Sequence, residues 1–169
     1  MRQINIRGGR ESLKQYAVLA FFVSVCLAAG GLGSIATARS VSDWYPLLAK
    51  PTWNPPSWIF GPVWTFLYIL MGAAAWRVWR SAGSFTAAQS ALLLFFVQLA
   101  LNIIWSWIFF GLRMPGPALI ELTLLWVGIA ATIKVFLVID TLAALMMSPY
   151  ILWVTFAGFL NFAIWILNR

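Results

Sequence analysis

Histidine is absent from this sequence of 169 residues, and cysteine occurs once, at Cys26. The lack of histidine removes the commonest metal ligand and proton shuttle, which excludes a zinc site, a histidine-dependent catalytic triad and a histidine-ligated haem. A single cysteine cannot form a disulfide within the chain, and a lone cysteine in an apolar run is usually inert packing. We therefore expect no metal site and no bound cofactor.

Charged residues are also scarce: they make up 9% of the chain, whereas 63% of the residues are hydrophobic. A soluble domain of this length carries about a quarter charged residues, so most of this sequence cannot face water. The net charge of +7 comes from basic residues scattered at the ends of apolar segments rather than gathered into one stripe. This distribution is typical of membrane topology and argues against nucleic-acid binding. The first partner that the sequence predicts is the lipid bilayer.

Uncharged stretches divide the chain into membrane spans, because one bilayer crossing takes about 20 apolar residues. The sequence predicts an all-α integral membrane protein, with one five-helix domain over residues 16–169 after a basic tail over residues 1–15. The predicted transmembrane helices cover residues 16–38, 62–78, 86–112, 116–139 and 142–167. The tail holds more basic residues than any loop, which places the amino terminus in the cytoplasm.

The connection between the first two predicted helices, residues 39–61, is the one long segment of mixed polarity. Prolines recur through it and forbid a continuous helix. The segment also contains Tyr45, Trp53 and Trp58, whose rings are costly to leave in water. We expect it to fold over one end of the bundle as an aromatic lid, stiffened by proline so that closing loses less entropy.

Two charged residues, Glu121 and Lys134, fall inside a predicted helix. They are about 20 Å apart along the helix axis, so they cannot pair with each other. Lys134 lies near the helix end, where its amine can reach the membrane surface. Glu121 lies about one turn from Gly116 and either reaches the interface or forms a polar wall of a cavity. No two carboxylates share a helix face, which leaves acid–base catalysis almost nothing to work with.

Tryptophan is unusually frequent, with 11 residues. An aromatic belt at the membrane interface accounts for some of the aromatic residues: Trp44, Tyr45, Trp58, Trp79 and Trp165. Asn102 and Trp105 fall deeper and share one face of the third helix. Trp153, Ala157 and Asn161 share one face of the fifth. Such faces suit a flat aromatic ligand, and they suit helix–helix packing equally well.

Several strings occur in order through residues 16–166. Around the lid they are Trp44-Tyr45, Leu48-Ala49-Lys50-Pro51-Thr52-Trp53-Asn54-Pro55-Pro56 and Pro62-Val63-Trp64. In the third helix they are Gln98-Leu99-Ala100-Leu101-Asn102, Trp105-Ser106 and Phe109-Phe110-Gly111, and in the fifth Pro149-Tyr150-Ile151-Leu152-Trp153 and Leu160-Asn161-Phe162. With this order and spacing the chain resembles the translocator protein family, whose bacterial members are called tryptophan-rich sensory proteins and whose animal members are called peripheral-type benzodiazepine receptors. The resemblance implies a five-helix bundle whose first loop covers a ligand pocket.

The resemblance also implies a ligand class, because members of the family bind porphyrins, and animal members bind cholesterol and aromatic drugs. The pocket positions carried over are Tyr45, Trp53, Asn54 and Pro55 on the lid, Trp64 and Tyr68 on the second helix, Asn102, Trp105 and Ser106 on the third, and Trp153 and Ala157 on the fifth. Porphyrin would be a ligand held by stacking and amide hydrogen bonds, so the metal-free form should bind at least as well as haem.

One departure concerns sterols. Animal members have a tyrosine closely followed by a basic residue near the end of the fifth helix. The matching stretch from Leu160 to Trp165 contains neither a tyrosine nor a basic residue. We therefore do not expect cholesterol to bind through that motif.

Three functions follow as hypotheses for a multi-pass protein of a bacterial cell membrane. The leading one is binding of tetrapyrroles or similar flat hydrophobic ligands, with transport or sensing as its purpose. The rival is an enzyme that degrades protoporphyrin IX in light, for which the resemblance implicates Trp64 and Trp153. The third is a structural module whose aromatic residues only pack. Small residues such as Ala29 and Gly33 allow two copies to form a homodimer without requiring it.

Overall fold

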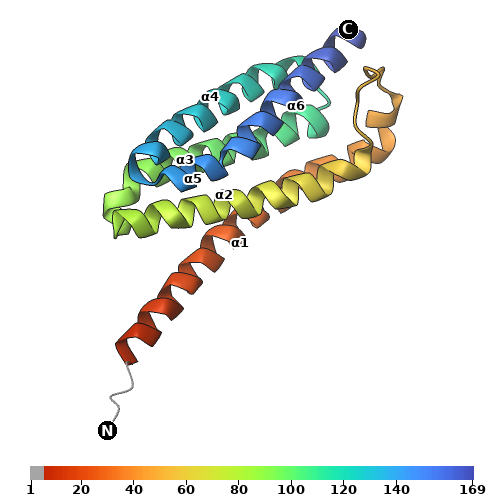
Figure 1. Cartoon of the computed structure of the whole chain (residues 1–169). Helices are drawn as coiled ribbons and strands as arrows, with labels where there is room; N and C mark the ends of the chain where they lie inside the picture. Colours follow the sequence, from red (N-terminus) through yellow and green to blue (C-terminus); the bar gives the residue numbers. More distant parts are fainter. Residues whose placement is uncertain (1–5) are drawn as a thin grey trace.

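The computed structural model describes the backbone of residues 6–169 and the side chains of residues 12–169. These described residues are almost entirely helical and contain no β-strand. Five stretches are long and apolar enough to cross a membrane: Ser12–Asp43, Ser57–Ala82, Phe85–Gly111, Pro115–Ile139 and Thr141–Leu167. The predicted five-helix membrane bundle is confirmed, and Figure 1 shows its helices running side by side.

The first helix, α1 (Ile6–Asp43), is longer than predicted at both ends. Its 38 residues span about 57 Å, whereas the hydrocarbon core of a bilayer is about 30 Å thick. The charges at Lys14 and Arg39 therefore mark where the membrane ends and not where the helix ends. The predicted tail over residues 1–15 is helical from Ile6 onward, and residues 1–5 lie outside the described residues. In Figure 1 the amino-terminal part of α1 projects away from the other helices.

Helices α2 (Phe60–Ala82) and α3 (Phe85–Ser106) form a hairpin with defined caps. α2 runs past the predicted end at residue 78 and stops at Gly83, whose φ of 80° is a left-handed conformation that favours glycine. The side chain of Ser84 accepts the N–H of Ala87 and caps α3. α3 continues as one π-helical turn, η3 (Trp107–Gly111), close to its predicted end.

The last predicted helix is two helices in the structure. After α4 (Pro115–Ile139) the chain forms the short helix α5 (Thr141–Met146) and then α6 (Ser148–Leu167). The predicted fifth membrane span over residues 142–167 is confirmed, but the helix is broken at Met147. Pro149 explains the break, because proline lacks the N–H that a continuous helix requires and is tolerated only in a first turn. The carboxylate of Asp140 caps α5 by accepting the N–H of Ala143 at 2.8 Å.

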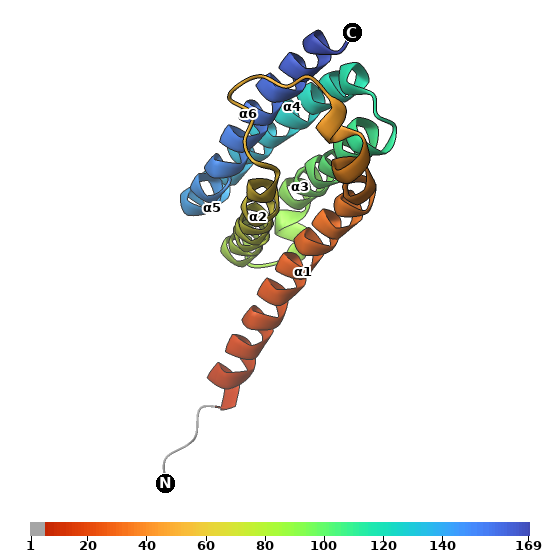
Figure 2. The same cartoon turned by 90° about the vertical axis from the view of Figure 1, so that its right-hand side faces the viewer.

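The connection between α1 and α2 is shorter than the predicted loop over residues 39–61, because both flanking helices extend into it. It contains two 3₁₀ turns, η1 (Tyr45–Leu47) and η2 (Ser57–Ile59). Figure 2 shows it crossing the end of the bundle close to the carboxyl terminus. There the Asn168 side chain accepts the N–H of Ala49 and donates to its carbonyl, both at 2.9 Å.

Small residues bring α1 close to its neighbours. A Cβ on Gly72 of α2 would lie 2.6 Å from the Cα of Val23, so only glycine permits this contact. A Cβ on Gly33 would lie 3.1 Å from the Ser106 hydroxyl of α3, and Ala29 is buried as well. Ala29 and Gly33 thus pack within one chain, and they offer no surface for the homodimer considered from the sequence.

Candidate ligand cavity

A cavity of about 370 Å³ lies in the half of the bundle next to the loop. Residues of α1, α2, α3, η3, α6 and the loop line it. Most of the predicted ligand residues are among them: Tyr45, Trp64, Tyr68, Trp105, Ser106, Trp153 and Ala157. The others, Trp53, Asn54, Pro55 and Asn102, do not line the cavity.

The lid residues that miss the cavity support the loop instead. Trp53 is 48% exposed and meets the ring of Phe156 edge-on at 5.8 Å. Asn54 accepts the Tyr45 hydroxyl at 2.7 Å and donates to the carbonyl of Pro55 at 3.0 Å. Among these lid positions, only Tyr45 contributes a wall of the cavity.

The Tyr45 hydroxyl is neutral in this setting. Burial raises the pKa of Tyr45 to about 12, although the hydrogen bond to Asn54 acts in the opposite direction. The Lys50 ammonium lies 4.9 Å from the centre of the Tyr45 ring. It donates to the carbonyls of Leu48 at 2.9 Å and Pro46 at 3.3 Å. The lysine is thus held within the loop and is not among the cavity-lining residues.

Asn102 lies directly behind the cavity wall and is 1% exposed. It accepts the Tyr68 hydroxyl at 2.5 Å and donates to the Tyr150 hydroxyl at 3.1 Å. A buried amide without partners would be costly in the membrane, and this arrangement supplies them. Asn102 therefore links α2, α3 and α6 and fixes Tyr68 rather than facing a ligand.

Tyr68 is held on three sides. Its ring stacks on Trp64 with 5.6 Å between ring centres and 28° between planes. On α1 the ring meets Gly30, where a Cβ would overlap it. Its hydroxyl is bound to Asn102. The cavity wall thus contains a pair of stacked rings, Trp64 and Tyr68, with a fixed orientation.

Trp105 is anchored by a second amide. Its indole N–H donates to Asn161 at 3.2 Å, and Asn161 donates to the carbonyl of Pro115 at 2.7 Å. The Trp105 ring also stacks on Phe109, with 5.5 Å between ring centres and 28° between planes. Asn161 lines the cavity as well. Its spacing from Trp153 had placed it on this face of the helix, although it was not among the predicted ligand residues.

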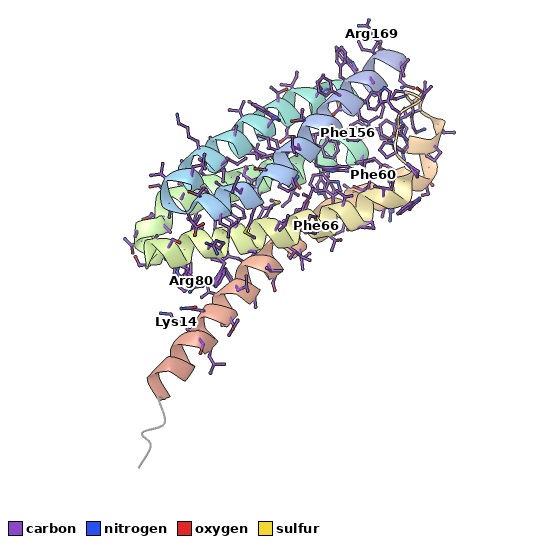
Figure 3. The ribbon with its side chains drawn as sticks, viewed as in Figure 1. Lys14, Phe60, Phe66, Arg80, Phe156 and Arg169 are labelled. Carbon is purple, nitrogen blue, oxygen red and sulfur yellow. The ribbon has the colours of Figure 1, made fainter. Side chains whose placement is uncertain are left out.

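Trp153 closes the side of the cavity between α2 and α6. Its ring packs against Phe60 of α2 and against Phe156, with 5.8 Å and 5.5 Å between the ring centres. Figure 3 shows Phe60 and Phe156 on these two helices near the loop. The Trp153 indole N–H is buried without a hydrogen-bond partner among the described residues.

Three of the hydroxyl groups that line the cavity are already engaged as donors. Ser34, Thr37 and Thr65 each donate to a carbonyl of their own helix, at 2.7, 2.9 and 2.9 Å. No aspartate, glutamate, lysine or arginine is among the described residues that line the cavity. The cavity therefore suits an uncharged or aromatic surface better than an ionic one.

Sequence reasoning missed the α1 wall. This wall consists of Leu27, Gly30, Gly31, Gly33, Ser34, Thr37 and Val41. Their spacing of three and four residues places them on one helix face, and that spacing was the available signal. It also fits helix packing, which is how small residues of a membrane helix are usually explained.

The two charges inside α4 lie apart from the cavity. Glu121 is 7% exposed, and neither carboxyl oxygen has a hydrogen-bond partner among the described residues. It does not line the cavity, so of the two alternatives left open by the sequence, the polar cavity wall does not hold for Glu121. Lys134 is exposed, as the sequence predicts. The described residues contain no cluster of three or more potential metal ligands.

The predicted aromatic belt is only partly at the surface. Trp58 is 74% exposed and Trp165 is 36% exposed, as belt residues are. Trp79, in contrast, is 8% exposed and packs on Phe85 with 5.4 Å between ring centres. The assignment of Trp79 to the belt is therefore wrong, because α2 continues past this residue and buries it against α3.

Comparison with known proteins gives consistent matches along the chain. A sequence model of the TspO/MBR family matches residues 22–166. Tryptophan-rich protein TspO from Chlorobaculum tepidum is 42% identical over 155 residues, covering 92% of this chain and 98% of that protein. Protein CrtK from Rhodobacter capsulatus is 43% identical, covering 93% and 94%. Human translocator protein is 44% identical over 142 residues, covering 81% and 84%. None of these three names is that of an enzyme.

Proposed function

This chain belongs to the TspO/MBR family, as its motifs predicted, and we propose that its cavity binds porphyrins or similar flat hydrophobic ligands. The observation that carries the proposal is an uncharged cavity walled by aromatic rings whose orientations are fixed. Trp64 is held by stacking on Tyr68, and Trp105 by its hydrogen bond to Asn161. Rings that are already ordered lose little entropy when a flat ligand stacks on them.

The purpose of binding is transport or sensing. The human relative is named a translocator protein, which supports reversible binding more than tight storage. The cavity lies inside the membrane domain, so its ligand would be one that dissolves in lipid. The amino-terminal end of α1 would face the cytoplasm, because the tail there holds more basic residues than any loop of the chain.

A titration tests the proposal. Protoporphyrin IX should quench the tryptophan fluorescence of the detergent-solubilised protein in a saturable manner. Replacing both Trp64 and Trp153 by phenylalanine should weaken binding by less than complete removal of the rings, which costs roughly 1–3 kcal/mol each, because phenylalanine keeps a smaller ring for stacking. Trp58→Phe is the matched control, since Trp58 is 74% exposed and outside the cavity. Equal affinity of all three proteins would refute the proposal.

The rival function, photo-oxidative degradation of porphyrin, keeps one supporting observation. Trp64 and Trp153 line the same cavity, so an excited porphyrin bound there would lie close to two oxidisable indoles. Illumination of the protein with protoporphyrin IX distinguishes the two. The enzymatic function is supported if the porphyrin absorption bands disappear faster with the protein than without it. This acceleration should be abolished in the double variant Trp64→Phe, Trp153→Phe. Loss at the protein-free rate leaves binding alone.

A further inference from the structure

The cavity is open on one side, between α1 and α2. The exposed residues among those that line the cavity all lie on α1 or on the first turns leading into α2: Leu27, Gly31, Ser34, Ser57, Gly61 and Thr65. Lining residues of α3, η3 and α6 are buried or half-buried. The opening therefore faces sideways rather than toward the loop.

The opening exists because α1 and α2 diverge between their last contact and the loop that connects them. They touch at Gly72 and again where Gly30 meets Tyr68. Beyond Gly30, α1 packs on the third helix and its π-helical turn, and Ser40 donates to the carbonyl of Phe110 at 2.5 Å. α2 instead packs on α6, where Phe60 meets Trp153. The space left between the two helices is the mouth of the cavity.

The mouth is flanked by apolar surface of the membrane spans. Gly31 and Ser34 fall within the apolar span Ser12–Asp43, and large apolar side chains beside them point outward. Leu32 is 51% exposed and Ile35 is 62% exposed. The rim itself is small, since a Cβ on Gly31 or Gly61 would meet no atom within 4 Å.

Two of the three hydroxyl groups on the rim already donate within their own helices. The Ser34 hydroxyl donates to its own helix at 2.7 Å, and the Thr65 hydroxyl does so at 2.9 Å. No charged residue lines the rim among the described residues. A hydrophobic molecule dissolved in the bilayer can thus pass between α1 and α2 without meeting a charged group.

The loop end, in contrast, is fastened. Asn168 holds Ala49 through two hydrogen bonds of 2.9 Å. Asn54 holds Tyr45, and the ring of Trp53 rests on Phe156. Entry from water would have to break these contacts, whereas entry from the bilayer breaks none of them.

We propose that the ligand enters and leaves the cavity from the bilayer core through the mouth between α1 and α2, while the loop stays fastened. The inference rests on the proposed function, since it requires that the cavity binds a ligand. It adds the source of that ligand, which is the hydrocarbon layer and not the aqueous phase.

Rim substitutions test the route in phosphatidylcholine vesicles, with the uncharged dimethyl ester of protoporphyrin IX as probe. Gly31→Phe should slow association by about tenfold, because the added ring obstructs the mouth. Gly61→Leu blocks the mouth from the other helix and should act the same way, so the test does not depend on one variant folding. Ala20→Phe is the control, because Ala20 is exposed on the same face of α1 about three turns away.

Asn168→Ala provides the opposite arm, because it unfastens the loop. The proposal expects wild-type rates for this variant, measured by stopped-flow quenching. Faster association in Asn168→Ala together with wild-type rates in both rim variants would overturn the route and place entry at the loop. Wild-type rates in every variant would also overturn the route while leaving the proposed function intact. Absence of saturable binding to the unmodified protein would instead remove the proposed function, and the route with it.

Discussion

At the scale of single residues, buried amides set the shape of the cavity. Asn102 joins the hydroxyls of Tyr68 and Tyr150, and Asn161 joins the indole of Trp105 to the backbone at Pro115. In hydrocarbon no water is present to replace a lost partner, so each amide holds its rings in one position. The aromatic walls are thus ordered by polar groups that lie at the edge of the cavity or behind it.

Asn102→Leu should therefore damage both stability and binding. The substitution keeps the approximate volume but leaves two buried tyrosine hydroxyls without their partner, which costs roughly 1–3 kcal/mol of unfolding free energy. Thermal unfolding in detergent should fall accordingly, and protoporphyrin IX should bind more weakly because Tyr68 loses its anchor. Gln89→Leu, at an exposed position of the same helix, is the control. Unchanged stability and affinity in Asn102→Leu would contradict this role.

Asp140 joins the α4–α5 boundary to α2. It receives Arg77 through both carboxyl oxygens, at 3.2 and 2.9 Å, and the Ser81 hydroxyl at 2.8 Å. Partial burial alone would raise the pKa of Asp140, but the Ala143 N–H, Arg77 and Ser81 outweigh it and lower the pKa to about 2. These bonds require the ionised carboxylate.

A pH dependence follows from that lowered pKa. The folded pKa lies below the unfolded value of about 3.9, so the contribution to stability is complete above about pH 4 and is lost as the pH falls toward about 2. The melting temperature of the wild type should drop across this range more steeply than that of Asp140→Asn. Asp43→Asn, at the exposed end of α1, serves as control. Parallel curves for wild type and Asp140→Asn would count against the ion pair.

At the scale of helices, close contacts decide where the cavity can be. α1 and α2 meet at Gly72, and their separation beyond Gly30 creates the mouth. α1 then packs on η3 at Gly111, where an added Cβ would lie 3.6 Å from the Cβ of Ala36. The position of small residues along α1 and α2 therefore determines both the tight and the open part of this helix pair.

Gly72→Ala should destabilise the bundle. The added Cβ would lie 2.6 and 2.8 Å from backbone atoms of Val23, which cannot move aside as a side chain can. Overpacking of this kind costs about 1–3 kcal/mol. Gly31→Ala meets nothing within 4 Å and should be neutral or slightly stabilising, because alanine favours a helix more than glycine does. Comparable melting temperatures for the two variants would contradict the close contact.

Helix number was predictable, and helix ends were not. Ionic side chains avoid hydrocarbon, so the uncharged stretches mark the spans correctly. The same charges do not end helices, which is why α1 runs past Arg39 and α2 past Arg77. The break at Met147 was not predicted either, although Pro149 indicates it, because an uninterrupted apolar stretch predicts a single membrane span.

At the scale of the whole molecule, the walls of the cavity come from segments far apart in the sequence. The spacing of Trp153 and Ala157 predicts a shared face, and both line the cavity. Which lid side chains point inward depends on the two 3₁₀ turns and on Asn168 at the other end of the chain, so the motif alone could not separate Tyr45 from Trp53. Asn102 was misplaced for the same reason, since Tyr68 of another helix covers it.

The central claim is that a flat aromatic ligand stacks on the rings of this cavity. ¹⁹F NMR of protein labelled with fluorotryptophan measures it directly, because a porphyrin ring shifts the resonances of the nuclei it stacks on. On addition of protoporphyrin IX, the signals of Trp64, Trp105 and Trp153 should shift in a saturable manner, while that of the exposed Trp58 stays in place. Shifts confined to Trp58, or no saturable shift at the three cavity tryptophans, would contradict the account.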